Sequence, residues 1–490
     1  MRDQSLALQQ KGSILNPDAV QRQKDRQAVI EFAEQFIESL RTTQAFIRPR
    51  SLKGKLEQPE NALGELEYIL DELQRDMISN GLNPASGGHL GYIPGGGIHS
   101  CALGDYLAAV TNQYAGIGFG GPGAVKIENE LIRWMCRLMG YPEGSLGNLA
   151  SGGSTANLIA FVTAREARGI RSDQYSQQCI YLTRQVHHCI HKAIRICGLT
   201  DAHTRFVDTD ERFRMKPEAL VHQIEQDLRD GLQPFMIIGS IGTTDTGAVD
   251  PVRSLGEIAA KYKLWYHIDA AYGGFFSFTS LMDREGVPVR ELFQGVEMSD
   301  SMAIDPHKGM FLAYGLGAIL IKDVASQYKA HYYRAAYMQD SLASQEELSP
   351  ADLSAELTKH FRGLRLWLPM RMYGVEPFAA LLDEKILLCR YFYERIGAAG
   401  FTTGPYPELS VCIYRYVPER GDANSFNEKI YEKVIDNGRI FISTTNIDGV
   451  YWMRLAVLSF RTHLEEIDIL LENLTDALRQ TRTELSVAGG

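Results

Sequence analysis

The residues best suited to chemistry lie in two short segments, HIDAAYGG (267–274) and DPHK (305–308). Asp269 ends the apolar run LWYHID, so we expect it at the carboxyl end of a strand, where α/β folds place ligands. The small residues that follow leave room for a flat ring, whose protonated nitrogen the carboxylate can hold. Lys308 follows another short apolar run, and a lysine in a pocket can lose its proton and form a Schiff base with an aldehyde.

A third segment could hold an anion. GNLASGGSTAN (147–157) leads into an expected helix over residues 158–168, and small residues at a helix start let backbone N–H groups approach a phosphate. Ser154 and Thr155 add hydroxyl donors. The spacing matches neither a dinucleotide-binding nor a P-loop fingerprint, and alone it would be a plain helix cap as often as a phosphate site. A phosphate cup, an acid for a pyridine nitrogen and an imine-forming lysine together indicate pyridoxal 5'-phosphate (PLP).

With these segments the chain resembles the group II PLP-dependent decarboxylases of fold type I, the family that includes aromatic-L-amino-acid decarboxylase. The resemblance covers nearly the whole chain. It extends to SIGTT (240–244), VHHCIHKA (186–193), LRLW (364–367) and RMYG (371–374).

The resemblance implies roles for individual residues. Lys308 would bind the cofactor aldehyde, Asp269 would pair with the ring nitrogen, and His187 would cover one face of the ring. The implied catalytic residues are Lys308, His187, Asp269 and His307. The implied cofactor-binding residues also include Gly153, Ser154 and His307 at the phosphate, and Ser240 and Ala271 at the ring or its hydroxyl.

Two further segments resemble the substrate-binding segments of the family. HLGYIPGGG (89–97) resembles a loop that lines the substrate side chain, and GIGF (116–119) resembles a segment delivered by the partner subunit. Neither contains Arg or Lys, which favours an aromatic or large apolar amino acid over an acidic one. Any single aromatic residue here could equally be interface core. Ile93 stands where aromatic decarboxylases usually have an aromatic residue, and Gly309 replaces a common tryptophan. The implied substrate-binding residues are Tyr92, Ile93, Pro94, Ile117 and Phe119.

The resemblance implies decarboxylation of an L-amino acid to its amine and CO2, with a loop tyrosine protonating the α-carbon. The corresponding loop, residues 329–357, ends in EELSPADL (346–353), which holds no tyrosine; Tyr332, Tyr333 and Tyr337 lie earlier. Two alternatives therefore remain. One is an aldehyde synthase, in which oxygen traps the carbanion, and the other is a non-catalytic binding protein of this fold.

His187 and His191 could share one face of a helix and bind a metal ion. No further His or carboxylate cluster with ligand spacing supports such a site, so we expect no metal. Stacking of His187 on the cofactor fits the neighbouring motifs better.

The elements that must position these residues follow from the apolar pattern. Between about residues 120 and 323, expected helices at 128–138 and 155–168 alternate with apolar runs at 179–182, 235–238, 264–268 and 317–321. This alternation predicts an α/β domain with a mostly parallel sheet. We expect a helical arm over residues 1–100, the PLP-binding domain over 101–372, and a small α+β domain over 373–490. The last would hold helices at 378–396 and 464–479 and strands at 410–416, 438–443 and 449–458.

Composition restricts the class of protein. The 490 residues include 50 Lys and Arg against 60 Asp and Glu, a formal charge of -10, without a basic cluster for nucleic acid or a membrane surface. No signal peptide and no membrane-spanning run is visible, and the seven scattered cysteines indicate reduced thiols. We therefore expect a cytoplasmic enzyme with a small-molecule substrate. The resemblance and the arm, which cannot bury its apolar faces alone, favour a homodimer with shared active sites.

Overall fold

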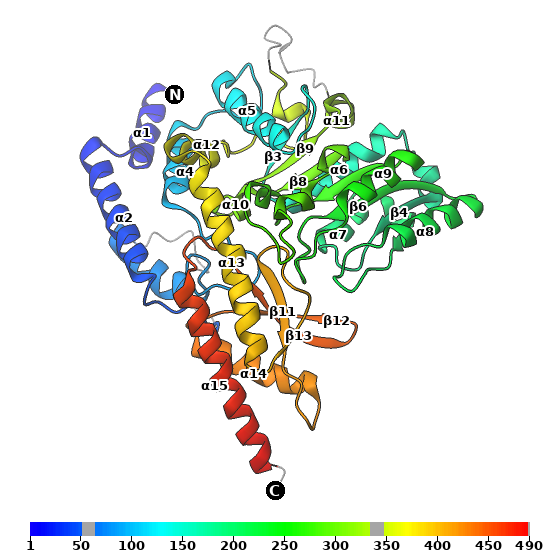
Figure 1. The fold of residues 1–490 in the computed structure, drawn as a ribbon. Coiled ribbons are helices and arrows are strands. Elements are labelled where there is room, and N and C mark those ends of the chain that lie inside the picture. The colour runs from blue at the N-terminus through cyan, green and yellow to red at the C-terminus, as the bar shows by residue number, and fades with distance from the viewer. Residues whose placement is uncertain (51–63, 334–346, 489–490) are drawn as a thin grey trace.

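The computed structural model describes residues 1–50, 64–333 and 347–488, with side chains as far as residue 484. At its centre is a seven-stranded sheet of order β3-β9-β8-β7-β6-β4-β5 (Figure 1). Strand β9 runs antiparallel to β3 and β8, and the other neighbouring pairs are parallel, which confirms the mostly parallel sheet. The strands are β3 (Leu146–Ala150), β4 (Gln178–Leu182), β5 (His203–Phe206), β6 (Gln233–Ser240), β7 (Trp265–Asp269), β8 (Ser301–Ile304) and β9 (Gly317–Ile321).

Helices cover both faces of this sheet, because successive strand residues point into different apolar clusters. Ile237 packs in a large cluster with residues of α5, α8 and α9, whereas its neighbour Ile238 packs with residues of α6 and α7. Every residue of β4 and β9 is buried, which explains why their apolar runs predicted these strands. Strand β8 is equally buried but was not predicted. The helices are α5 (Pro122–Leu138), α6 (Gly153–Ala167), α7 (Cys189–Ile196), α8 (Pro217–Arg229), α9 (Val252–Tyr262), α10 (Pro306–Gly309) and α11 (Val324–His331).

The C-terminal part has its own antiparallel sheet, of order β10-β11-β13-β12, and its own apolar cluster. Its strands are β10 (Thr402–Thr403), β11 (Val411–Arg415), β12 (Ser443–Ile447) and β13 (Val450–Ala456). Helices α13 (Glu376–Ala398), α14 (Ala423–Asn437) and α15 (Leu464–Ala488) pack with it. The expected strand at 438–443 is wrong, because the strand begins at Ser443. Residues before it instead pair with the loop at 88–90, where Phe441 exchanges hydrogen bonds with Gly88 and Leu90.

The N-terminal part is helical, as predicted. It contains α1 (Arg2–Gly12), α2 (Ala19–Ser39), α3 (Leu66–Glu72), a π-helical turn at Leu73–Ile78, and α4 (His99–Thr111). It also contains one short strand pair that was not predicted, in which β1 (Phe46–Ile47) pairs with β2 (Gly81–Leu82). Helices α1 and α2 lie along one side of the molecule, away from the seven-stranded sheet (Figure 1). Helix α4 packs on α12 (Leu364–Tyr373).

Both ends of the expected loop at 329–357 have structure. Helix α11 extends to His331, and Glu347 accepts hydrogen bonds from Asn129 and Arg133 of α5. The interpretation of the whole segment as an irregular loop is therefore wrong at its ends, which pack on the large domain. Tyr337 lies outside the described residues.

Two further findings concern composition. All seven cysteines lie within the described residues, and they are buried and form no disulfide. Among the helices of the described ranges, none combines the length and the apolar character needed to cross a bilayer.

Candidate active site

A cavity of about 350 Å³ lies at the carboxyl ends of β6 and β7, beside the start of α6. All eight residues predicted to bind the cofactor line it. Its other walls come from segments that the sequence motifs already contained. Thr155, expected to add a hydroxyl donor, lines it too, and the lining residues that the sequence did not single out for a role are Ser151, Gly152, Asn157, Cys189, Gly242, Thr243, Thr244, Tyr272 and Asp305.

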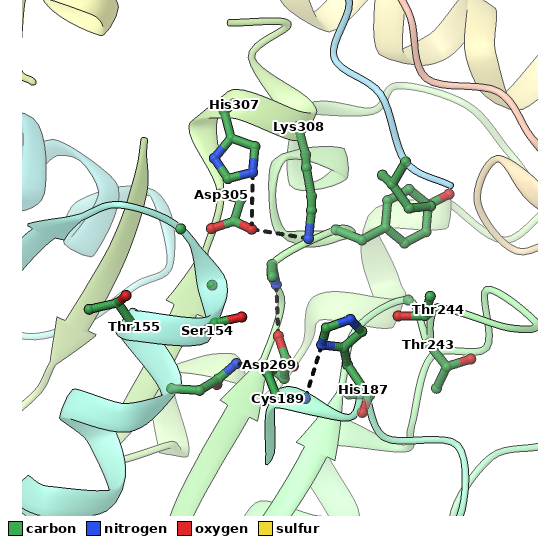
Figure 2. Close-up of a pocket in the computed structure, with 18 of the residues that line it drawn as sticks. Ser154, Thr155, His187, Cys189, Thr243, Thr244, Asp269, Asp305, His307 and Lys308 are labelled. Atoms are coloured by element: carbon green, nitrogen blue, oxygen red, sulfur yellow. Dashed lines mark hydrogen bonds and ion pairs between the residues drawn. The ribbon is translucent and has the colours of Figure 1, made fainter. Parts of the chain in front are cut away.

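Lys308 reaches the cavity from the short helix α10, which follows β8 after one residue. Its Nζ lies 3.0 Å from Oδ2 of the buried Asp305, and Figure 2 shows the side chain extending into the space above Asp269. Burial alone would lower the pKa of Lys308, but the carboxylates of Asp305 and Asp269 outweigh it and the net pKa is raised. The amine is therefore held as an ammonium, and it must lose that proton before it can attack an aldehyde.

Asp269 is the last residue of β7, so its carboxylate stands at the mouth of the sheet. Oδ1 accepts the Ala271 N–H at 3.1 Å, and Oδ2 accepts the Asn157 amide at 3.3 Å. Burial raises the pKa of Asp269, while Lys308 and these two donors oppose the rise. The carboxylate is thus supported by donors on one side and faces the cavity on the other.

The start of α6, where a phosphate cup is expected, lines the cavity. The first N–H groups of a helix have no partner within the helix, and they carry its positive end. A Cβ at Gly153 would lie 3.0 Å from both Ala271 Cβ and Asp305 Oδ2, so a side chain there would crowd the cup. The Ser154 side chain lies beside this turn (Figure 2), and the cup therefore offers backbone and hydroxyl donors at close range.

His307 and His187 lie on different sides of the cavity (Figure 2). The His307 Nδ1–H donates to the Leu316 carbonyl at 2.7 Å, which leaves Nε2 near Asp305 at 3.6 Å. His187 Nδ1 accepts the Cys189 N–H at 3.3 Å, so the ring proton is on Nε2. Burial, and then the neighbouring His188, lower the pKa of His187 to about 4, and the ring is neutral.

The two remaining cofactor candidates occupy the cavity wall. Ser240 is buried at the end of β6, and its N–H donates to Asp250 Oδ2 at 2.8 Å. Burial raises the pKa of Asp250 to about 6, although Met215 and Ser240 donate to it. Ala271 follows Asp269 and is also buried. Both positions present little side-chain bulk to a ring.

The predicted substrate residues are only partly brought together. Ile93 lines the cavity, whereas Tyr92 is 58% exposed and Phe119 is 70% exposed. Pro94 is buried and Ile117 is half-buried, and neither lines the cavity. Ile117 and Phe119 are predicted to contact the substrate of a partner subunit. A single chain does not test this, so it stays a prediction.

Metal binding has no geometric support in the parts of the chain that the structure describes. They hold no group of three or more His, Cys, Asp or Glu side chains that could hold a metal ion. His191 packs against Phe206 with ring centroids 6.1 Å apart, while the His187 ring packs against His188.

The cavity fits the cofactor that the sequence indicates. An amine, a supported carboxylate and a helix N-terminus surround one space, and they match the aldehyde, ring nitrogen and phosphate of PLP. The small residues at Gly153 and Ala271 leave the room that the ring and phosphate need. Asp305 adds negative charge beside the cup, but its ion pair with Lys308 offsets that charge.

Comparisons with known proteins agree with this fit. Residues 49–402 match the family model described as the pyridoxal-dependent decarboxylase conserved domain. The chain is 29% identical to an aromatic-L-amino-acid decarboxylase of Bacillus atrophaeus over 426 residues, covering 85% of this chain and 86% of that protein. It is 27% identical to a phenylacetaldehyde synthase of Petunia hybrida over 427 residues, covering 82% and 83%. The crystal structure of Catharanthus roseus tryptophan decarboxylase in complex with L-tryptophan has a similar fold, with a TM-score of 0.85 at 23% identity, covering 95% and 99%.

Proposed function

The chain belongs to the family of PLP-dependent decarboxylases, and from this premise we propose that it converts an L-amino acid with an aromatic or large apolar side chain into its amine and CO2. The observation that carries the proposal is the cavity in which Lys308, Asp269 and the start of α6 meet. Two of the relatives above, the aromatic-L-amino-acid decarboxylase and the tryptophan decarboxylase, are named for aromatic substrates, which supports the proposed substrate class.

The proposed roles are those that the resemblance implies, and all eight residues line the cavity. Lys308 would hold the cofactor covalently, Asp269 would pair with its ring nitrogen, and His187 would cover one ring face. Gly153, Ser154 and His307 would hold the phosphate, while Ser240 and Ala271 would contact the ring or its hydroxyl. When bound, PLP supplies the electron sink that accepts the electron pair left by departing CO2.

The residues of the chain then control charge and protons. Asp269, supported by Asn157 and the Ala271 N–H, keeps negative charge beside the ring nitrogen. Asp305 pairs with the Lys308 ammonium whenever the amine is free, because Lys308 Nζ and Asp305 Oδ2 lie 3.0 Å apart. His187 presents a neutral ring with its proton on Nε2, so it would have to take up a second proton before it could protonate a carbon above the ring.

Side-chain selection is proposed to depend on apolar contacts. Ile93 is the predicted substrate residue that reaches the cavity in one chain. Arg454 contacts the segment that contains Ile93, since its Nη1 donates to the Tyr92 carbonyl at 3.2 Å and to Ser443 Oγ at 2.9 Å. Arg454 does not line the cavity, so it offers an acidic substrate no partner there.

A substrate panel tests this proposal. The protein loaded with PLP is incubated with Phe, Tyr, Trp, Leu, Met and Glu, and CO2 release is measured. We expect release from at least one aromatic or large apolar amino acid, at a rate at least about tenfold above that from Glu, since one or two apolar contacts give about that discrimination. Release from Glu alone would contradict the proposed substrate class but not the family chemistry.

Aldehyde formation is the second candidate function. It is supported by the 27% identity to a phenylacetaldehyde synthase and by the absence of tyrosine from residues 347–353. In that reaction the amino acid, O2 and water give aldehyde, CO2, ammonia and hydrogen peroxide. Tyr332 is stacked on Tyr328 with centroids 4.6 Å apart, and Tyr333 is exposed to solvent. The third hypothesis, a non-catalytic binding protein, does not explain why Lys308 and Asp269 line the same cavity.

We also propose that the protein is a homodimer with active sites at the interface. Exposed apolar residues of α4, Leu103, Leu107 and Val110, and the exposed Phe119 support this. An obligate interface buries more than about 2,000 Å². Light scattering is expected to give twice the 54.8 kDa mass of the chain. A monomer with full activity would contradict the proposal.

A further inference from the structure

A chain of buried polar side chains runs from the middle of the sheet to Asp269. Trp265, His267 and Asp269 alternate along β7, so they share one face of the sheet, and His267 pairs with Ser301 of the neighbouring β8. Helix α6 contacts β7 and contributes Asn157. Asn157, His267 and Ser301 are all fully buried.

Each contact in this chain is a hydrogen bond. The Trp265 Nε1–H donates to Ser301 Oγ at 2.9 Å, and the same oxygen lies 2.9 Å from His267 Nδ1. His267 Nε2 lies 2.6 Å from Asn157 Oδ1. The Asn157 amide nitrogen donates to Asp269 Oδ2 and to Cys189 Sγ, both at 3.3 Å.

The direction of these bonds follows from donor chemistry. An indole N–H can only donate, so Ser301 Oγ accepts from Trp265 and its own hydrogen goes to His267 Nδ1. Burial lowers the pKa of His267 to about 3, so the ring is neutral and its one proton is on Nε2. That proton goes to Asn157 Oδ1, which turns the amide nitrogen toward Asp269.

The reverse direction is unfavourable. It would leave the buried Ser301 hydrogen without an acceptor among its recorded contacts and would place the Asn157 oxygen against the Asp269 carboxylate. The other groups that act on Asp269 are Lys308, the Ala271 N–H and Asp305. Of these, Asp305 opposes the charge on Asp269, so the donor from Asn157 matters.

We propose that Asn157, His267 and Ser301 are positioning residues that fix Asp269 as a hydrogen-bond acceptor and thereby favour a protonated nitrogen in the cofactor ring. This inference rests on the proposed pairing of Asp269 with that nitrogen. It assigns a role to three residues for which the sequence indicated none.

The test compares the affinity of cofactor-free protein for PLP with that for the analogue in which carbon replaces the ring nitrogen. Only PLP can use a charged Asp269, so the affinity ratio reports the contact at the nitrogen. We expect Asn157→Leu to lower this ratio roughly tenfold, the loss expected for one hydrogen bond to a charged group. A merely structural defect would weaken both ligands alike.

Ser301→Ala provides a second variant with a smaller change in volume. It removes the donor to His267 Nδ1, so the imidazole can take its other tautomer and Asn157 can turn its oxygen toward Asp269. The ratio is expected to fall in the same direction. Because this variant removes a single oxygen atom, it carries the test if Asn157→Leu does not fold.

Thr163→Val is the matched control. Thr163 is a fully buried residue of the same helix, and its hydroxyl donates to the Ile159 carbonyl at 2.8 Å, away from Asp269. The ratio of its affinities for PLP and for the analogue should equal that of the unaltered protein. If both Asn157→Leu and Ser301→Ala keep the ratio of the control, the inference is overturned. If the unaltered protein itself shows no preference for PLP over the analogue, and Asp269→Asn changes nothing, the proposed role of Asp269 fails instead.

Discussion

Replacing Lys308 by alanine is expected to lower turnover by on the order of a thousandfold or more, since it removes the amine that bonds the cofactor. The visible absorbance of the covalently held cofactor should disappear, while some PLP remains bound through the phosphate cup and Asp269. Turnover, absorbance and bound PLP are measured on the same preparation.

The structure supplies two controls for this variant. Asp305 is buried and paired with Lys308, so alanine also leaves a buried carboxylate without its cation and should lower the melting temperature. Lys308→Arg keeps the positive charge but cannot form the Schiff base, and it should restore stability without activity. Lys322→Ala alters a half-buried lysine whose pKa burial lowers, outside the cavity, and should change neither. Full activity in Lys308→Arg would contradict the assignment of Lys308 as the residue that bonds the cofactor.

Asp269→Asn is expected to retain bound PLP and to lose roughly 10²–10³ in turnover, the usual loss when a group that stabilises transition-state charge is removed. The neutral amide keeps the size of the carboxylate but no longer favours a protonated ring nitrogen. Turnover at saturating substrate and PLP separates this loss from weaker cofactor binding.

The matched control is Asp300→Asn. Asp300 is a half-buried carboxylate that accepts the Tyr266 N–H at 2.8 Å, and burial raises its pKa as it does that of Asp269. It does not line the cavity, so its replacement should affect stability more than turnover. Equal losses of turnover in the two variants would show that Asp269 acts only through the fold.

Much of the fold could be predicted because its central strands are buried on both faces. Runs such as those of β4 and β9 contain no exposed residue, and they are recognisable as apolar segments bounded by polar ones. Burial also explains why the strand predicted at 438–443 is wrong. Ile440 and Ile442 are buried by the loop at 88–90 and the C-terminal cluster rather than by a sheet, and the sequence does not distinguish the two kinds of burial.

The site could be predicted where a residue's role follows from its place at the end of a strand. Asp269 ends β7, and Lys308 follows β8 closely, so the sheet alone brings them together. No role was predicted for Asn157, although it belongs to the segment 147–157, because its contact with Asp269 depends on how α6 is rotated against β7. Likewise, the positions of Ile117 and Phe119 relative to a substrate depend on how two chains meet.

The central claim is that this chain replaces the carboxylate of an amino acid by a proton. The most direct test uses the amino acid that releases CO2 fastest, in D2O with oxygen present, and measures CO2, amine, aldehyde and peroxide together with the mass of the amine. The account predicts equal amounts of CO2 and amine, little peroxide, and one deuterium on the carbon that lost CO2. Aldehyde and peroxide formed in step with CO2 would contradict it and establish the oxidative reaction instead.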